Sequence, residues 1–366
     1  MAIRVLHIVT HMGRGGLETM IMNYYRNIDR SKIQFDFLVH RDFESAYDKE
    51  ILELGGQIFH VPMLNPFSPA YYKALDAFFS THKYDIVHSH LDCLSAYPLR
   101  SAKKHGVKVR IAHGHNKNQD RNFKYPIKAI SRYFMPIYAT HLFACSTDAG
   151  NWMFPRKQFT VMNNAIDASV FTYSEECTSK MHNLYGFDDK FVLGHVGRFN
   201  PQKNHSFLID VFSAVHKKCP NSVLALVGSG DGMQEIKNKV FSLNLQDSVL
   251  FCGETPNVSS FLQAIDVFVF PSLYEGLGIA AVEAQAAGLP CILSDQVPLE
   301  CKMTDDVEFI SLSSPPETWA EHICSYRNYQ RKNTYNAICN AGFDIKQNVK
   351  WLENFYLKEL EGCEQA

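Results

Sequence analysis

The chain has 366 residues, with 36 Lys and Arg against 38 Asp and Glu, so its formal net charge is -2. A charge this close to zero argues against a dedicated nucleic-acid-binding protein, and we expect no nucleic-acid partner. Its 46% of hydrophobic and 13% of aromatic residues exclude a disordered or fibrous chain, because they suffice for buried cores. At ~100–200 residues per domain, the length predicts two domains.

Membrane spans and cross-links are both unexpected. The longest apolar runs, such as AIDVFVF ending at Phe270, fall well short of the ~20 residues that cross a bilayer. The amino-terminal sequence MAIRVLHIVTH contains no apolar region of secretory length, which favours a cytoplasmic protein. The ten cysteines form no C-x-x-C pair, so we expect neither a disulfide framework nor a zinc site.

Histidine is the remaining source of metal ligands, with 16 residues but no H-E-x-x-H motif. The close groupings are His88 with His90 and His113 with His115. Taking the side chains of a strand to alternate between its faces, we expect only one histidine of each pair to face a cleft. The sequence therefore predicts no metal site.

Both halves of the chain repeat one pattern: a short apolar run, then Gly or Pro, then an amphipathic stretch. This pattern is typical of alternating strands and helices that build parallel sheets. In the first half it predicts helices at residues 17–27 and 69–81 and strands at residues 3–9, 35–39, 57–61, 86–89, 109–113, 141–145 and 159–161. In the second half it predicts strands at residues 191–196, 222–227, 249–252, 267–270, 290–293 and 307–310.

The two halves differ in charge. Residues 1–170 carry 21 basic and 14 acidic side chains, whereas residues 171–366 carry 15 and 24. A polar segment, TYSEECTSKMHNLYGFDD, interrupts the alternation of strands and helices and indicates a domain boundary near residues 165–190. We therefore expect two doubly wound, Rossmann-like α/β domains, 1–168 and 169–346. Because such folds bind ligands in the loops that follow their strands, we expect the functional residues there.

The first such loop, THMGRGGLET, follows the strand at residues 3–9. Gly15 and Gly16 allow a ligand to approach the backbone, and the amino end of the next helix offers free N–H groups to a phosphate or hydroxyl. A tight turn that only packs strand against helix is the alternative. The dinucleotide fingerprint G-x-G-x-x-G fails here, because its last position is Glu18.

The loop GRFNPQKNH follows the strand at residues 191–196. It places Arg198 and Lys203 five residues apart beside Gly197, so both cations can converge on one anion. A diphosphate matches this pair, since the guanidinium is a fork of donors and the ammonium a point charge. Solvated surface charges are the alternative.

The most informative segment is FPSLYEGLGIAAVEAQAAGLPCI, after the strand at residues 267–270. Glu275 precedes a Gly-Leu-Gly turn, and we expect a helix to begin near Gly278, with Glu283 one to two turns inside it. Amides at the helix start suit a pyrophosphate, and the Glu283 carboxylate can accept from both hydroxyls of a ribose. Glu275 is placed to accept from hydroxyls of a sugar beyond the phosphates. An unpaired carboxylate is costly to bury in this Ala-rich helix, which favours a binding role.

These motifs resemble those of the retaining GT-B glycosyltransferases of family GT4. The sequence E-G-L-G-x-x-x-x-E resembles the family's E-x7-E motif, and GRFNPQK resembles its G-R…K loop. The likeness covers nearly the whole chain, because GGLE, NNAIDASVF and VGSGDGMQEIK also resemble family segments in the same order. RIAHGHN and SDQVPLE are similar to transferases of bacterial capsule and exopolysaccharide assembly.

The resemblance implies a nucleotide-sugar donor, with a UDP-sugar favoured, bound mainly by the C-terminal domain without a cofactor or metal. Arg198 and Lys203 would hold the diphosphate and stabilise its developing charge, Glu283 would bind the ribose and Glu275 the donor sugar. Neither glutamate is suited to form a covalent intermediate, so the acceptor hydroxyl would attack from the face that the nucleotide leaves.

Other residues receive roles from the same resemblance. Amides from Leu277 through Ile279 would support the phosphate, and the segment Phe251–Glu254 would lie beside the base. The family places a histidine after a strand near the donor sugar. His113 and His115 compete for that role, and His113 is favoured because it ends its strand.

The chain departs from the family's pattern in two respects, and the resemblance implies one further helix. Ala165 replaces the Gly of the family's interdomain motif, and no motif identifies the acceptor. The chain end is amphipathic, and the resemblance implies that a helix at residues 347–361 returns to the N-terminal domain and completes it.

Residues 100–134 contain ten Lys or Arg and one acidic residue, Asp120, with aromatic and aliphatic side chains interleaved at their end. This pattern predicts contact with an anionic membrane surface, on the inner face of the plasma membrane. The acceptor would then be a saccharide or a lipid-linked saccharide. A solvated basic face and a nucleic-acid patch are the alternatives.

Three other functions compete with a retaining hexosyltransferase of capsule or exopolysaccharide biosynthesis. A GT-B nucleotide-sugar epimerase would use the same cleft without an acceptor, but the E-x7-E pattern disfavours it. A nicotinamide-dependent oxidoreductase has the same order of strands and helices but needs the third Gly that is missing here. A non-catalytic scaffold subunit of a polysaccharide assembly complex is disfavoured because the donor-site residues are all present.

Overall fold

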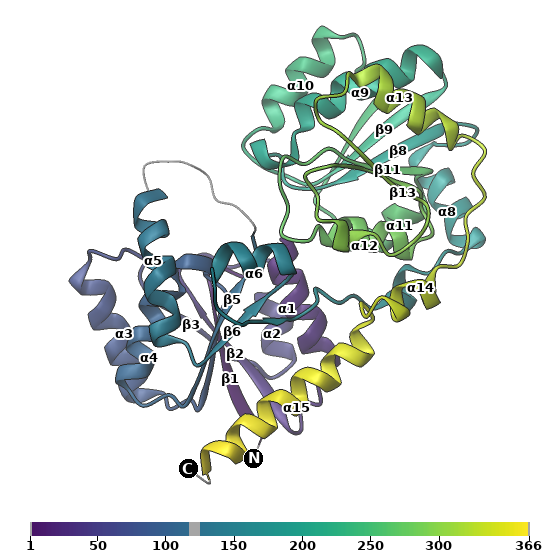
Figure 1. The fold of residues 1–366 in the computed structure, drawn as a ribbon. Helices are drawn as coiled ribbons and strands as arrows, with labels where there is room; N and C mark the ends of the chain where they lie inside the picture. Colours follow the sequence, from purple (N-terminus) through teal and green to yellow (C-terminus); the bar gives the residue numbers. More distant parts are fainter. Residues whose placement is uncertain (1, 117–124, 365–366) are drawn as a thin grey trace. The chain divides into compact units, whose positions relative to one another are not determined.

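The computed structural model describes residues 2–116 and 125–364 and divides the chain into two compact units. The N-terminal unit combines Met1–Ala165 with Ile345–Ala366, and the C-terminal unit spans Ile166–Asp344. Each unit is built around one parallel sheet (Figure 1). The chain thus changes units within a few residues of the boundaries expected at 168 and 346.

Seven parallel strands form the N-terminal sheet, in the order β3-β2-β1-β4-β5-β6-β7. The direction of winding reverses between β1 and β4, which is where doubly wound folds open a crevice. The strands are β1 (Ile3–Val9), β2 (Ile33–Val39), β3 (Ile58–His60), β4 (Ile86–Ser89), β5 (Val109–Gly114), β6 (His141–Ala144) and β7 (Thr160–Val161). The helices are α1 (Gly16–Asn27), α2 (Asp48–Glu53), α3 (Pro69–Thr81), η1 (Asp92–Ser95), α4 (Ala96–Lys104), α5 (Tyr125–Tyr138), α6 (Thr147–Met153) and α15 (Ile345–Glu364).

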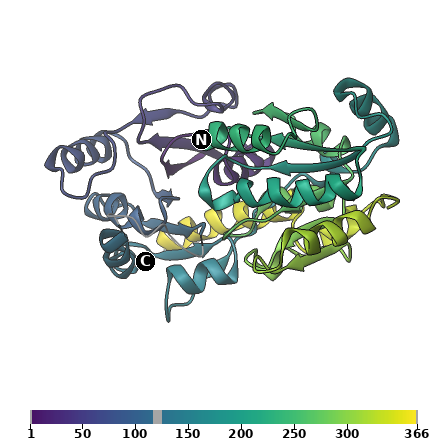
Figure 2. The ribbon, with the colours of Figure 1, turned by 90° about the horizontal axis from the view of Figure 1, so that it is seen from above.

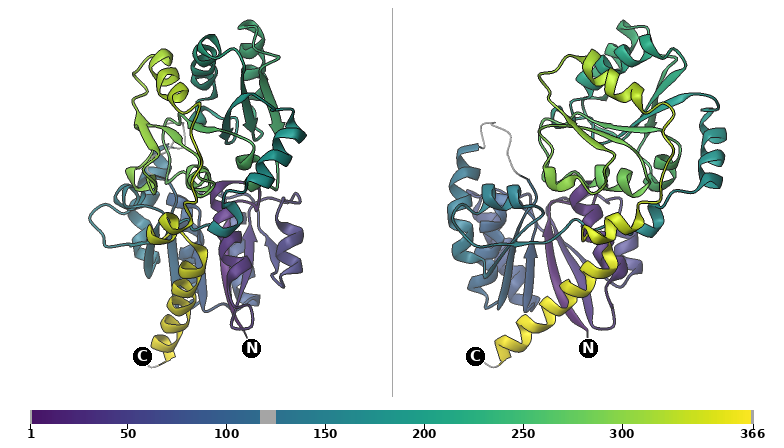
Figure 3. Two further views of the ribbon diagram at one scale, coloured as in Figure 1. Left: turned by 90° about the vertical axis from the view of Figure 1, so that its right-hand side faces the viewer. Right: turned by 45° about the vertical axis from the view of Figure 1, so that its right-hand side comes forward.

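Helix α15 crosses one face of the N-terminal sheet (Figures 2 and 3). Its Tyr356 packs edge-on against Phe35 of β2, with ring centroids 6.3 Å apart. Its Phe355 packs against Phe143 of β6, with ring centroids 5.0 Å apart. The last helix of the chain therefore covers the central strands of the first unit.

Six parallel strands form the C-terminal sheet, in the order β10-β9-β8-β11-β12-β13. They are β8 (Phe191–Val196), β9 (Ser222–Val227), β10 (Val249–Gly253), β11 (Val267–Phe270), β12 (Cys291–Ser294) and β13 (Val307–Ile310). The helices are α7 (Ala168–Phe171), α8 (Glu175–Tyr185), η2 (Pro201–Lys203), α9 (His205–Lys218), α10 (Met233–Ser242), α11 (Val258–Gln263), α12 (Ile279–Ala286), η3 (Leu299–Cys301), α13 (Pro316–Ser325) and α14 (Tyr335–Asn340).

Each strand of the C-terminal sheet contributes to two apolar clusters, one on each face. Val192 packs with residues of α11 and α12, whereas its neighbour Leu193 packs with residues of α9 and α13. Figure 1 shows these two pairs of helices on opposite sides of the sheet. Because both faces are covered, the strands are continuous apolar runs, and this made them easy to predict.

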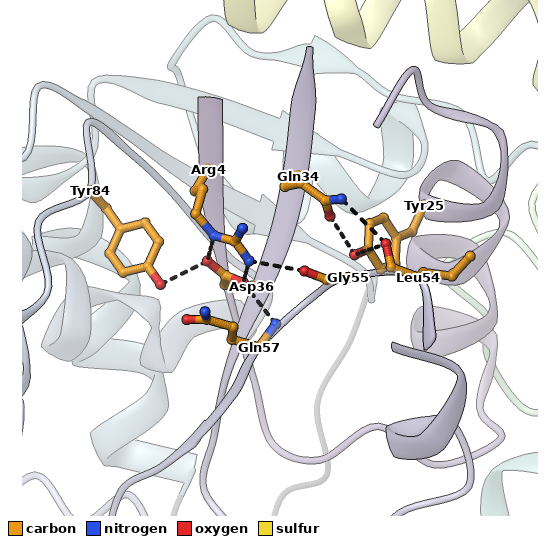
Figure 4. A network of polar contacts seen from close by, with 8 residues as sticks. All are labelled: Arg4, Tyr25, Gln34, Asp36, Leu54, Gly55, Gln57 and Tyr84. Atoms are coloured by element: carbon orange, nitrogen blue, oxygen red, sulfur yellow. Dashed lines mark hydrogen bonds and ion pairs between the residues drawn. The ribbon is translucent and has the colours of Figure 1, made fainter. Parts of the chain in front are cut away.

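The N-terminal sheet also contains a buried polar network near the amino ends of its strands (Figure 4). The Asp36 carboxylate on β2 is fully buried and accepts from Nε of Arg4 on β1 at 2.6 Å. It also accepts from the Tyr84 hydroxyl at 2.9 Å and from the Gln57 backbone N–H at 2.8 Å. These contacts satisfy a carboxylate that would otherwise be costly to bury.

One segment differs from the expectation. The polar stretch that follows residue 171 was expected to break the alternation of strands and helices, but most of it forms α8. The Ser174 hydroxyl caps this helix by accepting from the Cys177 N–H, and Gly186 ends it in the left-handed conformation. None of its residues is fully buried, and Met181 and Tyr185, which pack against the core, stand among charged and polar neighbours, so the segment was not predicted as a helix.

Candidate functional site

The loops that follow three neighbouring strands of the C-terminal sheet are joined by main-chain hydrogen bonds. The Phe199 N–H, after β8, donates to the carbonyl of Ser229, after β9, at 2.8 Å. The Gly228 N–H donates to the carbonyl of Gly253, at the end of β10, also at 2.8 Å. The carboxyl ends of these strands thus present one connected backbone surface, where doubly wound folds bind ligands.

Glycines make this close contact possible. Gly228 and Gly230 have φ of +142° and +149°, which residues with a Cβ atom rarely adopt. A Cβ atom on Gly228 would lie 2.0 Å from the carbonyl oxygen of Gly197, and one on Gly230 would lie 2.6 Å from that of Phe199. The VGSGDG segment therefore fixes the loop that carries Arg198.

The structure brings Lys203 and Glu275 together, although 72 residues separate them. Lys203 Nζ lies 2.6 Å from Glu275 Oε1 and 4.5 Å from the centroid of the Phe270 ring. The two side chains are only 16% and 7% exposed, so their charges are poorly screened by water. Gly197 permits this arrangement, because a Cβ atom there would lie 3.1 Å from Lys203 Cδ.

Gln202 was not predicted from the sequence, yet it connects the two charged loops. Its side-chain N–H donates to the main-chain carbonyl of Tyr274 at 2.9 Å. Its main-chain carbonyl accepts from the Leu273 N–H at 2.8 Å. These bonds fix the loop of Lys203 against the loop of Glu275. The sequence offers no sign of this role beyond the position of Gln202 next to Lys203.

Helix α12 begins where the sequence predicted, at Ile279. Gly278 precedes it with φ of +93° and, within the described residues, no side chain caps the helix start, so its first amides are available to a ligand. Glu283 lies one turn inside and is 6% exposed. Burial raises the pKa of its carboxyl to about 8. Within residues 2–116 and 125–364, no side chain or backbone group hydrogen-bonds to this carboxyl.

Three other predicted donor-site residues lie at the same ends of the strands. Arg198 is exposed on the loop after β8, in contrast to the shielded Lys203. Glu254 is exposed after β10 and accepts a hydrogen bond from the Ser229 hydroxyl. Leu277 is buried in the turn before α12.

Two buried histidines, His195 and His205, lie beside this site and were not predicted. His195 Nδ1 hydrogen-bonds to the carbonyl of Val269 at 2.9 Å, and the His205 ring stacks on Phe199 at 4.1 Å. Burial lowers the pKa of His205 to about 4 and that of His195 well below its usual range. Both are therefore neutral packing groups near pH 7. Their strand and helix positions give no sequence signal that separates them from core residues.

In the N-terminal unit, α1 begins at Gly16 after the turn at Gly15. Gly15 occupies the cap position and has no side chain that could accept from the first amides of the helix. The start of α1 thus keeps N–H groups for a ligand, as the loop sequence suggested.

Five histidines from three adjacent strands form a buried cluster in the N-terminal unit. The first row runs from His7 Nδ1 to His90 Nε2 at 3.0 Å, and from His90 Nδ1 to His115 Nε2 at 3.0 Å. The second row joins His88 Nε2 to His113 Nδ1 at 3.1 Å. His113 is 1% and His115 is 9% exposed.

The expectation that only one histidine of each pair faces a cleft is wrong. His88 and His90 are two residues apart, as are His113 and His115, and strand residues at this spacing point to the same face. The rings of His88 and His90 accordingly stack with centroids 4.2 Å apart, and those of His113 and His115 lie 4.1 Å apart. Both predicted candidates, His113 and His115, belong to one cluster.

The cluster is neutral at pH 7. Burial lowers the pKa of His7 and of His115 to about 3. It lowers the pKa of His88, His90 and His113 well below the usual range, and the neighbouring imidazoles lower it further. Each ring therefore carries one N–H and one bare nitrogen.

Two overlapping groups in this cluster have the spacing of metal ligands. One is His7, His88 and His90, and the other is His90, His113 and His115; in each, one ligand atom per residue lies within 4.8 Å of the others. His90 belongs to both groups. Carboxylate or backbone groups usually orient metal-bound histidines, whereas the rings of this cluster are bonded mainly to each other.

The basic segment predicted to contact membranes includes residues 117–124, which lie outside the described residues. In the described part, α5 exposes a row of apolar side chains at the spacing of one helix face, each half or more exposed: Ile130, Tyr133, Phe134 and Ile137. Lys103 of α4 lies beside this helix and donates to the carbonyl of Ile137 at 3.1 Å. No helix in residues 2–116 and 125–364 has the length and apolar character of a membrane span.

Comparison with known proteins places these features in a family. The family model described as Glycosyltransferase Family 4 matches residues 14–170, and that described as Glycosyl transferases group 1 matches residues 179–337. The matches cover one region in each unit.

Individual relatives extend this likeness. The putative glycosyltransferase EpsF of Bacillus subtilis (strain 168) is 36% identical over 374 residues, with 96% of each chain covered. The UDP-Gal:alpha-D-GlcNAc-diphosphoundecaprenol alpha-1,3-galactosyltransferase of Escherichia coli is 27% identical, over 75% of this chain and 76% of the relative.

Among solved structures, Anabaena HepE in complex with UDP and glucose has a TM-score of 0.81 at 18% identity, covering 97% of this chain and 99% of HepE. At this identity the likeness shows the fold. Together with the match to EpsF over nearly the whole chain, it shows that the chain belongs to the family 4 glycosyltransferases and has the GT-B fold.

Proposed function

We propose that this glycosyltransferase moves a hexose from a UDP-sugar to a hydroxyl of a growing cell-surface saccharide, with retention of anomeric configuration. The observation that carries the proposal is the shielded Lys203–Glu275 pair beside the uncapped start of α12. A cation, free amides and a carboxylate in one place match the charge and hydroxyl pattern of a sugar diphosphate.

Each donor-site residue then has a chemical role. Arg198 and Lys203 bind the diphosphate, and the amides of Leu277–Ile279 add donors at the helix start. Glu283 accepts from the ribose hydroxyls, which supply the hydrogen bonds that its buried carboxyl lacks in the protein alone. Glu275 accepts from hydroxyls of the donor sugar once its partner Lys203 turns to the phosphate.

Glu254 would lie beside the base. The family resemblance also assigns donor contacts to the backbone at Gly15 and Gly16 and to His113, with His115 as its competitor. These assignments follow the family resemblance and agree with the position of each residue at the carboxyl end of a strand.

In the proposed reaction, the bond from the anomeric carbon to the β-phosphate oxygen breaks while the acceptor oxygen bonds to the same face of that carbon. The acceptor proton passes to the leaving phosphate oxygen. Lys203 and Arg198 stabilise the negative charge that develops on the diphosphate, which is a large catalytic contribution in a shielded site. Glu275 and Glu283 stay bound to hydroxyls, so neither forms a covalent intermediate.

We further propose a lipid-linked saccharide of capsule or exopolysaccharide synthesis as the acceptor. Two observations support this proposal. The Escherichia coli relative is named for an acceptor carried on diphosphoundecaprenol. The apolar face of α5, with the basic Lys103 beside it, suits contact with an anionic lipid surface on the inner face of the membrane.

The test supplies UDP-galactose, UDP-glucose or UDP-N-acetylglucosamine together with undecaprenyl-diphosphate saccharides in detergent. We expect mass spectrometry to detect one added hexose with one of these donors, and the proton coupling of the new anomeric centre to report α linkage. Release of free sugar without transfer, or a β product, would contradict the proposal. The Lys203→Met variant is the control for contaminating transferases.

A further inference from the structure

The Tyr356 hydroxyl fixes which groups donate and which accept in the second row of the histidine cluster. Tyr356 on α15 is fully buried, and its hydroxyl lies 2.8 Å from His88 Nδ1. Among the described residues, this nitrogen is the only hydrogen-bond partner of the hydroxyl. If His88 donated from Nδ1, the hydroxyl proton would be buried without an acceptor, which is unfavourable. Tyr356 therefore donates, and His88 Nδ1 accepts.

The direction of this hydrogen bond determines which nitrogen carries the proton in both histidines of the row. Burial keeps both His88 and His113 neutral, so each ring carries one proton. Because His88 accepts at Nδ1, its proton is on Nε2 and is donated to His113 Nδ1 at 3.1 Å. The proton of His113 must then be on Nε2. That nitrogen is buried and has no hydrogen-bond partner among residues 2–116 and 125–364.

We infer that Tyr356 and His88 are positioning residues that hold His113 in the Nε2–H tautomer, with this N–H directed to an oxygen of a bound ligand. The inference uses the proposed function in one respect only, which is that this oxygen belongs to the donor sugar. It also gives α15 a role beyond packing, because a helix from the end of the chain sets the tautomer of a residue on β5.

In the first row, which consists of His7, His90 and His115, no contact between described residues fixes which nitrogens donate. In the described part of the chain, His7 Nε2 and His115 Nδ1 are both buried without a hydrogen-bond partner, so no hydroxyl bonds to either end of the row. Three neutral rings carry three N–H groups, and two of these make the hydrogen bonds of the row, so one N–H remains at one of its two ends. No contact among the described residues of this row determines which end carries it. His115 is thus not fixed as a donor, which favours His113 as the ligand-binding histidine.

A second tyrosine–histidine pair in the same unit provides a matched control. His40 Nδ1 lies 2.8 Å from the Val9 carbonyl oxygen, and His40 Nε2 lies 2.9 Å from the Tyr71 hydroxyl. The carbonyl can only accept, so His40 must carry its proton on Nδ1. The two histidines bonded to tyrosine are therefore expected to be opposite tautomers.

The test is a two-bond proton–nitrogen correlation spectrum of the 15N-labelled full-length protein at pH 7.5, with signals assigned from His88→Asn, His113→Asn and His40→Asn variants. We expect protonated Nε2 in His88 and His113 and protonated Nδ1 in His40. Tyr356→Phe should give His113 a mixture of tautomers, whereas Tyr71→Phe should leave His113 unchanged. The spectrum needs no donor, so it decides the inference even if the proposed activity fails.

Binding of UDP-glucose supplies the second readout. Tyr356→Phe is expected to weaken binding of UDP-glucose roughly two- to tenfold, the effect of one net hydrogen bond, while leaving binding of UDP unchanged. Equal loss for both ligands would indicate a general structural defect and overturn the positioning role.

Two spectral results and one analytical result would also overturn the inference. These are protonated Nδ1 in wild-type His113, an unchanged His113 tautomer in Tyr356→Phe, and a stoichiometric metal on the cluster in elemental analysis of the same sample. If Tyr356→Phe does not fold, the wild-type spectrum alone decides the tautomer, and His88→Gln replaces it in the binding comparison.

Discussion

Glu283 carries a carboxyl group that the folded protein makes difficult to ionise. Its pKa rises from 4.5 to about 8 on burial. Between these values the folded state keeps a proton that the unfolded state has lost, so the free energy of unfolding falls as pH increases. We predict that Glu283→Gln removes this effect and stabilises the protein at pH 8 by about 1–3 kcal/mol.

The same substitution should weaken UDP binding, because an amide offers one neutral accepting oxygen to the two ribose hydroxyls, whereas a carboxylate offers two charged ones. Thermal unfolding from pH 5 to pH 9 and calorimetric titration with UDP measure the two effects. The assignment fails if the variant has the wild-type pH profile or binds UDP as tightly as the wild type does.

The Lys203–Glu275 pair allows stability and catalysis to be separated. Lys203→Met leaves the carboxylate of Glu275 shielded without its partner, so we predict a loss of about 1–3 kcal/mol in stability together with a roughly 10²–10³-fold fall in kcat. The double variant Lys203→Met/Glu275→Gln should regain the stability but not the activity. Denaturant titration and transfer rates give both quantities. Recovery of activity in the double variant would contradict a direct role for Lys203.

At the scale of residues, the sequence predicted Lys203, Glu275 and Glu283 because each lies in a short motif that follows an apolar strand. Gln202 and Tyr356 could not be predicted in this way. Gln202 acts through a loop 72 residues away, and Tyr356 acts through His88, 268 residues away. Such partners become visible only when the fold has brought the segments together.

At the scale of elements, the buried strands were predicted nearly to their ends, since a covered parallel strand is an unbroken apolar run. Helix α3 was predicted at its observed bounds because Ser68 and Pro69 mark its start. Helix α8 was missed because its few apolar residues, none of them fully buried, stand among charged and polar ones. The alignment of His88 with His90 was also missed, although the period of a strand is two residues.

The buried carboxylate of Asp36 links β1, β2 and the residues around them. We predict that Asp36→Ala destabilises the N-terminal unit by about 1–3 kcal/mol, because it leaves the Tyr84 hydroxyl and the Gln57 N–H without their acceptor. The control is Asp85→Ala, which removes an exposed pair with Lys108 and should cost less than about 1 kcal/mol. Urea unfolding compares the two. Equal effects would show that the network adds no stability.

Helix α5 presents its apolar row to solvent, and we predict that this row binds anionic lipid. The double variant Phe134→Ser/Ile137→Ser should sediment at least several-fold less with vesicles of phosphatidylglycerol and phosphatidylcholine. Phe241→Ser removes an even more exposed apolar side chain from α10 and should not change sedimentation. Neither protein should bind pure phosphatidylcholine strongly, since basic residues contribute to the attraction. Wild-type protein that remains in the supernatant with anionic vesicles would contradict the prediction.

At the scale of the whole molecule, two units of similar architecture differ in charge and in the chemistry of their strand ends. Residues 1–170 carry a net +7 and residues 171–366 a net -9. The basic unit contains the exposed face of α5 and the neutral histidine cluster, whereas the acidic unit contains the cations proposed to bind the diphosphate. We propose on this basis that the first unit contacts the membrane and the acceptor, and that the second unit binds the nucleotide of the donor.

The central claim is that the C-terminal unit binds a nucleoside diphosphate through Lys203, and thermal unfolding with UDP, GDP, ADP or NAD tests it most directly. A ligand that binds only the folded state stabilises it by about 2.7 kcal/mol at 100 times its Kd. We predict that UDP raises the Tm of the wild type and that Lys203→Met loses most of this increase. Stabilisation by NAD alone, or an equal increase with UDP in both proteins, would contradict the account.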